Sequence, residues 1–330
     1  MNSFGRLFRV SVFGESHGAG IGLVLDGCPA GLALDENDFS LDLERRKPAG
    51  EGTTARREAD RPVFLAGIFE GRTTGAPLVL TFANADTRPA DYDFVRDTCR
   101  PGHADFAALT KFGGFNDLRG GGHSSGRLTL ALVAAGVVAK KLIRPAVVEA
   151  RLEEAGGEED AAGAAARAAR DGDSIGGLIA CRVAPIPAGL GEPFFDSLDA
   201  LIAHLLFSIP AVKGIEFGAG FRAARMRGSE HNDPIIAADG TTSSNHAGGV
   251  NGGISNGNPV LFRVAVKPAS SIGRPQETWS FASGGTTGLS VPGRHDACLA
   301  LRVPVIVEAA AAVALADLML REQKIPRVLG

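Results

Sequence analysis

The hydrophobic residues of this chain recur with two different periods, which predicts both strands and helices. Short runs rich in Val, Leu, Ile and Phe, bounded by Gly and polar residues, predict strands. They cover residues 7–12, 21–25, 63–67, 78–82, 178–184, 212–217 and 260–266. The turn-rich EGRTTG segment between two of them indicates a hairpin or a longer β-connection. Turn-linked strand pairs outnumber clear βαβ units, so the pattern favours an α+β fold with antiparallel sheets packed on central helices.

Four segments have the composition and end signals of helices, residues 35–46, 124–143, 198–207 and 305–320. Asp35 is the expected N-cap of the first, which ends on Arg45 and Arg46. The second and the fourth are so rich in Ala, Val and Leu that we expect them to be buried on most sides. Between residues 144 and 173 the composition changes to Ala, Glu, Arg and Gly. We expect a single domain, residues 1–330, with a variable segment at about 144–173.

Composition excludes several classes of partner. The 330 residues carry 34 Lys and Arg against 37 Asp and Glu, so the net charge of −3 gives no general electrostatic case for binding nucleic acid or a membrane. The four cysteines form no CxxC pair, and no metal motif is present. The N-terminus has no apolar signal region, and the longest apolar stretch, residues 128–139, is too short to span a bilayer. We expect a cytoplasmic protein with a small-molecule substrate.

Five of the seven histidines lie in glycine- or serine-rich segments: FGESHG (13–18), RPGHAD (100–105), RGGGHSSGR (119–127), SNHAGG (244–249) and GRHDAC (293–298). Glycine lets backbone N–H groups approach an anion closely, and histidine holds or passes a proton near neutral pH. Basic residues also crowd the stretch 45–61. We expect the five segments to form one composite site around an anionic ligand.

Taken singly, each segment is open to more than one interpretation. RGGGHSSGR leads into the helix predicted to begin near Ser124, which favours either a phosphate site or simply a serine-capped buried helix. Glu15 and His17 would share one face of an extended strand. Ser16 beside His17 is only a weak sign of a hydrolase, because sequence neighbours rarely point at each other.

The ordered motifs FGESHG, RR…TT.RRE.D, RPGHAD, RGGG.SS.R, SNHAGG…GGIS.G, KP..S and GRHD resemble those of the chorismate synthase family. The resemblance runs from Gly5 to about Leu320, except for residues 144–173. The family forms chorismate from 5-enolpyruvylshikimate 3-phosphate by trans-1,4-elimination of phosphate, using reduced FMN without net redox change, in aromatic amino acid biosynthesis. The resemblance implies a carbon–oxygen lyase, a β-α-β sandwich and a homotetramer, and it admits NADPH only as a reductant of FMN.

The same resemblance implies a role for individual residues. His17 is the general acid at the leaving phosphate, His103 lies by the flavin ring, and Asp296 helps to relay the proton from the flavin together with Ser125. The implied substrate-binding residues are Arg45, Arg46, Arg100, Arg119 and Arg127, of which Arg46 is also associated with NADP. The implied FMN contacts are His123, Ser124, Ser125, Ala211, Gly252, Lys267, Pro268, Ala269, Ser270, Ser271 and Arg294.

The chain departs from the family pattern at three of its motifs. His123 stands where many relatives carry Arg, Glu51 lies about where an Arg associated with NADPH is common, and Ala297 replaces the usual Pro. Two other functions stay open. A phosphate-binding transferase without flavin would not bind FMN in a substrate-dependent way. A non-catalytic binding protein would have no need of His17 and Asp296.

Overall fold

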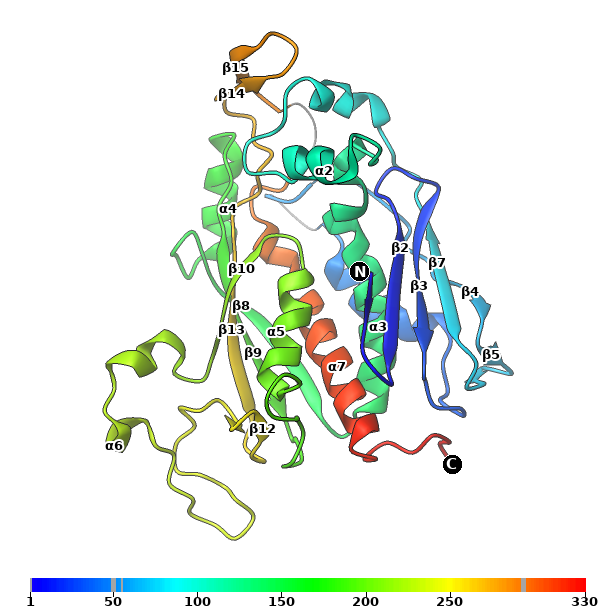
Figure 1. Cartoon of the computed structure of the whole chain (residues 1–330), viewed down its shortest axis with the longest axis vertical. Helices are drawn as coiled ribbons and strands as arrows, with labels where there is room; N and C mark the ends of the chain where they lie inside the picture. The colour runs from blue at the N-terminus through cyan, green and yellow to red at the C-terminus, as the bar shows by residue number, and fades with distance from the viewer. Residues whose placement is uncertain (1, 49–51, 55, 292–294) are drawn as a thin grey trace.

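The chain folds into three layers, a sheet, a set of helices and a second sheet. The computed structural model describes residues 2–48, 52–54, 56–291 and 295–330. A five-stranded sheet of order β1-β2-β3-β7-β4 lies on one side and a four-stranded sheet of order β10-β13-β9-β8 on the other. Helices α3, α5 and α7 run between the two sheets (Figure 1). This arrangement confirms the predicted α+β class and the β-α-β sandwich.

The five-stranded sheet is antiparallel throughout. Its strands are β1 (Ser3–Phe4), β2 (Arg9–Gly14), β3 (Gly20–Asp26), β4 (Val63–Ala66) and β7 (Leu78–Ala83). Alternate residues of β3 and β7, among them Leu23 and Leu80, are buried against the helices. The predicted EGRTTG hairpin is confirmed, with β5 (Ile68–Phe69) paired to β6 (Arg72–Thr73).

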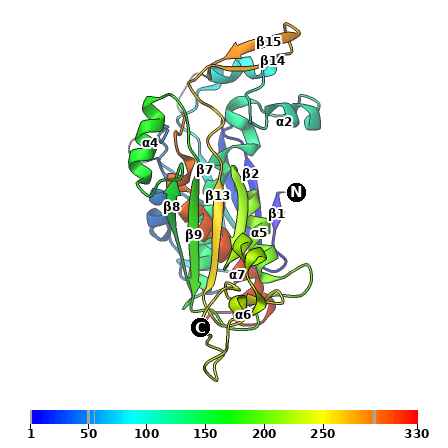
Figure 2. The same ribbon diagram turned by 90° about the vertical axis from the view of Figure 1, so that its left-hand side faces the viewer.

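The four-stranded sheet is also antiparallel. It contains β8 (Val147–Ala155), β9 (Gly177–Ala184), β10 (Val212–Phe217) and β13 (Val260–Val266). Figure 2 shows this sheet from outside, with α4 (Ala161–Arg170) beside its upper part. Residues 144–173 therefore contain an edge strand and a helix, neither of which the composition predicted. That this segment varies in length among relatives stays a prediction.

The central helices are α3 (Thr129–Leu142), α5 (Leu198–Ser208) and α7 (Pro304–Arg321). The predicted burial of the alanine-rich helices is confirmed, because every residue of α7 from 305 to 320 is buried. A Cβ on Gly136 of α3 would lie 2.3 Å from the Cβ of Ala309, so the two helices pack with almost no space between their backbones. The glycine at this crossing allows the close approach.

Two helix starts differ from the prediction. The helix expected from Ser124 begins at Thr129, because Gly120 to Gly122 have positive φ and Ser125 is extended. A 3-10 turn, η4 (Gly126–Leu128), connects them. The helix expected over residues 35–46 is a 3-10 turn, η1 (Glu36–Phe39), followed by α1 (Ser40–Arg46). Asp35 is the N-cap as predicted, in a capping box with Asp38.

The remaining elements are short. At the upper end in Figure 1 are α2 (Asp105–Phe112) and the hairpin of β14 (Gln276–Ser280) and β15 (Gly285–Leu289). The others are η2 (Pro89–Arg96), η3 (Arg119–Ser124), η5 (Gly220–Arg225), α6 (Gly228–His231), β11 (Val250–Asn251), β12 (Ile254–Ser255) and η6 (Leu299–Arg302). Among the described helices, none is both long and apolar enough to cross a membrane.

Candidate active site

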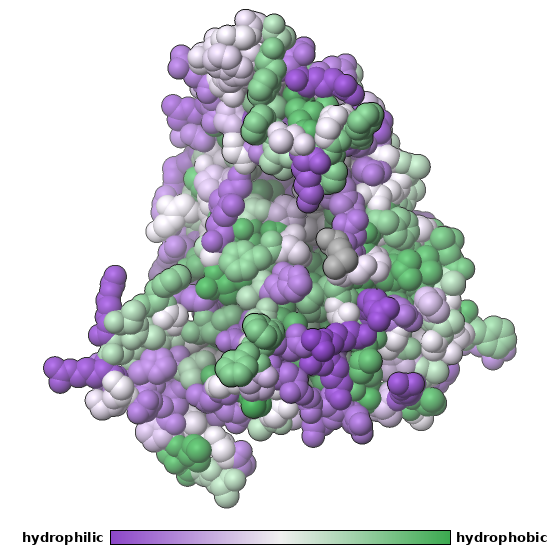
Figure 3. Space-filling model, in the orientation of Figure 1, coloured by the Kyte–Doolittle hydropathy of each residue, from purple (hydrophilic) through white to green (hydrophobic). Residues whose placement is uncertain are grey.

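A cavity of about 840 Å³ lies where loops from most of the chain meet the first residues of α3 and the start of α7. In the space-filling view the molecule is hollowed below its upper end (Figure 3). Among the described residues, eight Lys and Arg but only three Asp and Glu line the cavity. The N-terminal ends of two helices add further positive potential. The cavity is therefore suited to an anionic ligand.

Most of the predicted site residues line this cavity. They are Arg46, Arg100, His103, His123, Ser124, Ser125, Arg127, Ala211, Lys267, Pro268, Ala269, Ser270, Ser271 and Asp296. Arg294 and Glu51 lie outside the described residues.

His17 is not one of the described residues that line the cavity, but it lies directly behind Gly120, which is. A Cβ on Gly120 would be 2.4 Å from both Cε1 and Nδ1 of His17, so the imidazole packs on the glycine backbone. The ring of Tyr92 contacts it edge to face, with ring centroids 5.0 Å apart. Nδ1 is buried and has no hydrogen-bond partner among the described residues. Burial, and then the charges of Arg56 and Arg119, lower the pKa of His17.

The expectation that Glu15 and His17 share a strand face is wrong. β2 ends at Gly14, and residues 15–19 form a turn before β3. Arg56 fixes this turn by donating from Nη1 to Ser16 Oγ (3.1 Å) and from Nη2 to the Ser16 carbonyl (3.0 Å). The same hydrogen bonds hold the Arg56 guanidinium near His17.

His103 belongs to a compact cluster with Arg100 and Asp105. Arg100 donates from Nε and Nη2 to the two oxygens of Asp105 at 2.8 and 2.7 Å. Nδ1 of His103 is 2.9 Å from Asp105 Oδ1. Burial acts to raise the pKa of Asp105, but its hydrogen bonds to Arg100 and His103 hold that pKa well below its usual range. In the tautomer with Nδ1–H, the ionised Asp105 accepts a hydrogen bond from His103, which leaves Nε2 as the nitrogen for ligand chemistry.

Arg46 and Arg127 are joined by Asp60. Arg46 Nη2 donates to Asp60 Oδ2 at 2.9 Å, and Arg127 Nη1 donates to Oδ1. Burial acts to raise the pKa of Asp60, but the two guanidiniums lower it overall. Burial also lowers the pKa of Arg46 to about 10, which still leaves it charged at neutral pH. The cluster of two cations and one anion keeps one net positive charge in the cavity wall.

Asp296 has a partner on each carboxylate oxygen. Oδ1 accepts from the backbone N–H of Thr54 at 2.9 Å, and Oδ2 accepts from Arg302 Nη2 at 2.6 Å. Arg302 comes from η6, just before α7. It was not among the site residues predicted from the sequence. The same is true of Asp60, although its motif RRE.D was part of the resemblance. Arg302 and Asp60 are found through their ion pairs with predicted site residues, which only the structure shows.

The loop that starts at Lys267 is connected to the His103 segment. Lys267 Nζ donates to the Gly102 carbonyl at 2.9 Å and to Ser270 Oγ, and Ser270 Oγ donates to the same carbonyl at 2.7 Å. Burial and the charge of Lys213 lower the pKa of Lys267. An ammonium has three N–H donors, so among the described partners one donor of Lys267 remains for a ligand.

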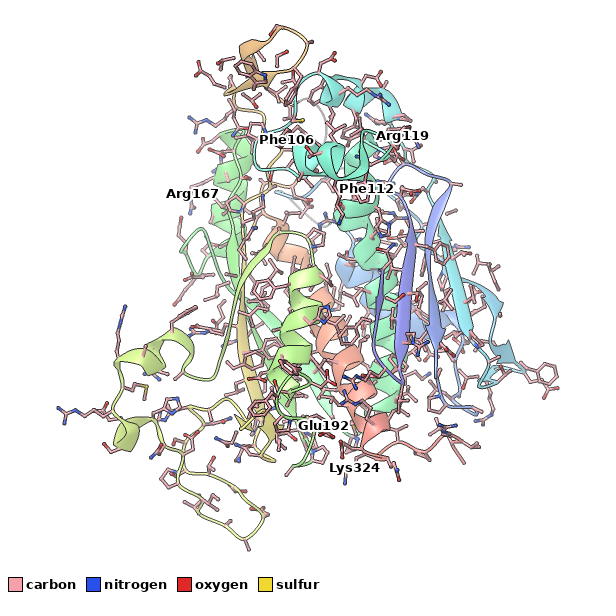
Figure 4. All side chains as sticks on the ribbon, in the orientation of Figure 1. Phe106, Phe112, Arg119, Arg167, Glu192 and Lys324 are labelled. Carbon is pink, nitrogen blue, oxygen red and sulfur yellow. The ribbon has the colours of Figure 1, made fainter. Side chains whose placement is uncertain are left out.

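Three predicted binding residues are not in the cavity wall that the described residues form. Arg45 points away because neighbours in a helix are about 100° apart, and it donates to both oxygens of Glu308 at 2.7 Å instead. Arg119 is paired to Asp117 beside α2 (Figure 4). Gly252 lies in the turn between β11 and β12, at the lower end of the molecule.

Within one chain the structure thus brings together four of the five histidine segments, and the expectation that all five meet is wrong for the described residues of a single chain. The fifth, SNHAGG, is a structural turn in the lower part of the molecule. Asn245 donates from Nδ2 to the Pro259 carbonyl at 2.8 Å and accepts from Gly249 N at 2.7 Å. These bonds join the turn to the segment that leads into β13.

The residues present fit a flavin mononucleotide. Lys267 provides a charge and one remaining N–H donor suited to a phosphate, and Ser124, Ser125 and Ser271 face the same cavity. The glycine backbone at 120–122 provides a surface without side chains beside His103. A Cβ on Gly121 would lie only 3.2 Å from His103 Cε1, so a side chain there would crowd the imidazole. The volume of about 840 Å³ is in the range of ligand and cofactor sites.

Comparisons with known proteins identify the family of the chain. The family model described as "Chorismate synthase" matches residues 8–320. A chorismate synthase of Chitinophaga pinensis is 59% identical over 99% of both chains, and one of Archaeoglobus fulgidus is 44% identical over 100% of both. A solved structure titled "Crystal Structure of Chorismate Synthase" superposes with a TM-score of 0.74 at 26% identity, over 97% of this chain and 93% of that one. The chain therefore belongs to the chorismate synthase family, and it is an enzyme of aromatic biosynthesis, a carbon–oxygen lyase.

Proposed function

We propose that the protein converts 5-enolpyruvylshikimate 3-phosphate to chorismate and phosphate, with reduced FMN bound in the cavity. One observation carries this proposal. A wall of mainly positive charge contains His103 and Asp296, two groups suited to proton handling, and a third, His17, lies directly behind the wall residue Gly120. A binding protein for anions needs the charge but has no use for the proton-handling groups.

Arginines are the natural ligands of the substrate. Its two carboxylates and one phosphate require several charged donors, and guanidinium groups pair with both kinds of anion through two parallel hydrogen bonds. Arg46 and Arg127 are held in fixed positions by Asp60, so little side-chain entropy is lost when they bind. Arg100 is held in the same way by Asp105.

FMN supplies, when bound in its reduced form, an electron-rich ring that assists loss of phosphate from the allylic system without net oxidation. Lys267 and Ser271 are the residues that would hold its phosphate, with Ser270 holding Lys267 in place, and Ser124, Ser125 and His103 would lie along the remaining part. We also propose that NADPH acts only as a reductant of FMN.

His17 donates a proton to the departing phosphate in this proposal. Its lowered pKa favours the neutral imidazole in the free protein. A bound phosphate dianion acts in the opposite direction and raises the pKa, so the imidazolium would form when the substrate is in place. Asp296 is the carboxylate in the wall that can accept the proton lost from the ring, with Ser125 facing the same cavity. Arg302 and the Thr54 N–H hold Asp296 in position.

The test is anaerobic incubation of the purified protein with the substrate and either chemically reduced or oxidised FMN. Chorismate, followed by absorbance, and phosphate should appear only with reduced FMN. Equal turnover with oxidised FMN would favour a flavin-free mechanism and contradict the proposal, as would absence of product with reduced FMN.

We further propose a homotetramer in the cytoplasm, each chain a single domain. The outer face of the four-stranded sheet supports assembly, since no element covers its central strands in the side view (Figure 2). That face includes small and apolar residues of β9 and β13, such as Ala180 and Ala265. Light scattering coupled to size-exclusion chromatography should give about four times the chain mass of 34.0 kDa.

A further inference from the structure

Asn84 connects the turn that carries His17 to the arginine cluster of the cavity. It follows β7, the strand that pairs with β3, and its backbone N–H donates to the Ala19 carbonyl at 3.1 Å. Its side-chain Nδ2 donates to the Glu15 carbonyl at 3.0 Å and to the Gly18 carbonyl at 2.9 Å. The side chain therefore holds both ends of the turn in which His17 lies.

The other side of the same amide faces Arg127. Arg127 donates from Nε to Asn84 Oδ1 at 3.1 Å, while its Nη1 donates to Asp60. A primary amide has two N–H donors and one oxygen, and here all three are used. The partners also settle which way the amide is oriented, since two carbonyls need donors and a guanidinium needs an acceptor.

The sheet does not need this side chain. Gly20 and Ala83 are already paired in the ladder of β3 and β7. The turn is closed on its own by Gly18 N donating to the Glu15 carbonyl at 3.2 Å, and Ser16 N donates to the Gly122 carbonyl at 3.1 Å. What the Asn84 amide adds is a fixed distance between the turn and the guanidinium of Arg127.

We propose that Asn84 is a positioning residue, which sets the imidazole of His17 relative to the anion held by Arg127. This inference rests on the proposed function, because it assigns His17 and Arg127 to opposite sides of one reacting substrate. A general acid displaced by about 1 Å from its acceptor loses on the order of 100-fold in rate. Two hydrogen bonds to one turn and one to the arginine are the means of preventing that displacement.

Asn84→Asp removes the N–H donors of the side chain and keeps the oxygen that accepts from Arg127. A carboxylate still accepts from Arg127, but it cannot donate to the Glu15 and Gly18 carbonyls and repels them. With reduced FMN, kcat should fall by roughly 10- to 100-fold. KM should rise as well, because the new carboxylate offsets the net positive charge of the cluster of Arg46, Asp60 and Arg127. In a His17→Ala background the same substitution should cost less than about threefold, because the group that it positions is gone.

Asn258→Asp is the matched control. Asn258 is buried, and its Nδ2 likewise donates to a backbone carbonyl, that of Gly240 at 3.1 Å, but it does not line the cavity. Its substitution should lower thermal stability and leave kcat at the wild-type value in both backgrounds. Equal losses of kcat from Asn84→Asp with and without His17, or an effect on KM alone, would overturn the proposal.

A second readout does not depend on turnover. The Cε1–H signal of His17, identified by its loss in His17→Ala, should shift in Asn84→Asp and in Asn84→Ala, while that of His231 on α6 stays in place. An unmoved His17 signal would overturn the inference about Asn84, whether or not the wild-type protein turns over. Absence of wild-type turnover, by contrast, would contradict the proposed function. If both Asn84 variants fail to fold by circular dichroism, Asn84 is an architectural residue and the inference is wrong.

Discussion

Gly120 offers a way to move His17 without changing it. Gly120 has φ +61°, and a Cβ there would lie 2.4 Å from Cε1 and Nδ1 of His17 and 3.1 Å from Ser16 Oγ. Ordinary contacts of a Cβ begin at 3.4 Å, so the imidazole must move by about 1 Å in Gly120→Ala. A displacement of that size costs on the order of 100-fold in rate. We therefore expect kcat to fall by about that factor, with a smaller change in FMN affinity.

The strain of placing alanine at a positive φ has to be separated from the clash. That strain is about 1–2 kcal/mol for an L-residue in the left-handed region. Gly113, at the end of α2, has φ +60°, and the atom nearest to a Cβ there would be Phe115 Cδ2 at 3.7 Å. Gly113→Ala thus carries the same backbone strain without a clash and should keep normal turnover. If single-turnover rates with reduced FMN are equal in the two variants, His17 is not where the chemistry occurs.

Two other predictions concern stability. Asp317, buried in α7, accepts the backbone N–H groups of Arg6, Leu7 and Phe8 at 2.9, 2.7 and 2.9 Å. Asp317→Ala should lower the free energy of unfolding by about 3 kcal/mol or more, because the buried N–H donors lose their acceptor. Asp317→Asn keeps one acceptor oxygen and should lower it by less. Equal urea midpoints for the two variants would contradict this. The folded-state pKa of His17 is lowered, so its contribution to stability is complete above the unfolded value of about 6.5 and is lost as pH falls through the folded pKa. His17→Gln should therefore flatten the fall in Tm between about pH 7 and pH 5, and an unchanged slope would refute the assignment.

The elements that the sequence predicts best are those with a simple burial pattern. β13 has the predicted bounds, and every second one of its residues is buried. β8 was missed because its strand VVEARLEEA is an edge strand, which exposes Glu149 and Arg151 and so resembles a charged loop. The helix start at Ser124 was wrong because alanine-rich helical composition says little about the glycine turn before it.

In the candidate site, the sequence likewise predicts the residues that lie in motifs but not those that act through distant partners. His103, Asp296 and the loop from Lys267 lie in motifs and are brought together as predicted. Asp60 and Asn84 act through partners that are distant in the sequence, since Asp60 joins Arg46 to Arg127 and Asn84 contacts a turn 65 to 69 residues earlier. Contacts of this kind depend on which strands are neighbours. A single sequence predicts such pairs only once the sheet order is known.

We propose that one cavity carries out an elimination that uses reduced FMN without consuming it. The most direct measurement supplies the protein, under strictly anaerobic conditions, with reduced FMN well below the substrate concentration and records chorismate, phosphate and the flavin spectrum together. We expect equal amounts of chorismate and phosphate, many product molecules for each FMN, and a flavin that is still reduced at the end. Product limited to one molecule per FMN with oxidation of the flavin, or phosphate released without chorismate, would contradict it.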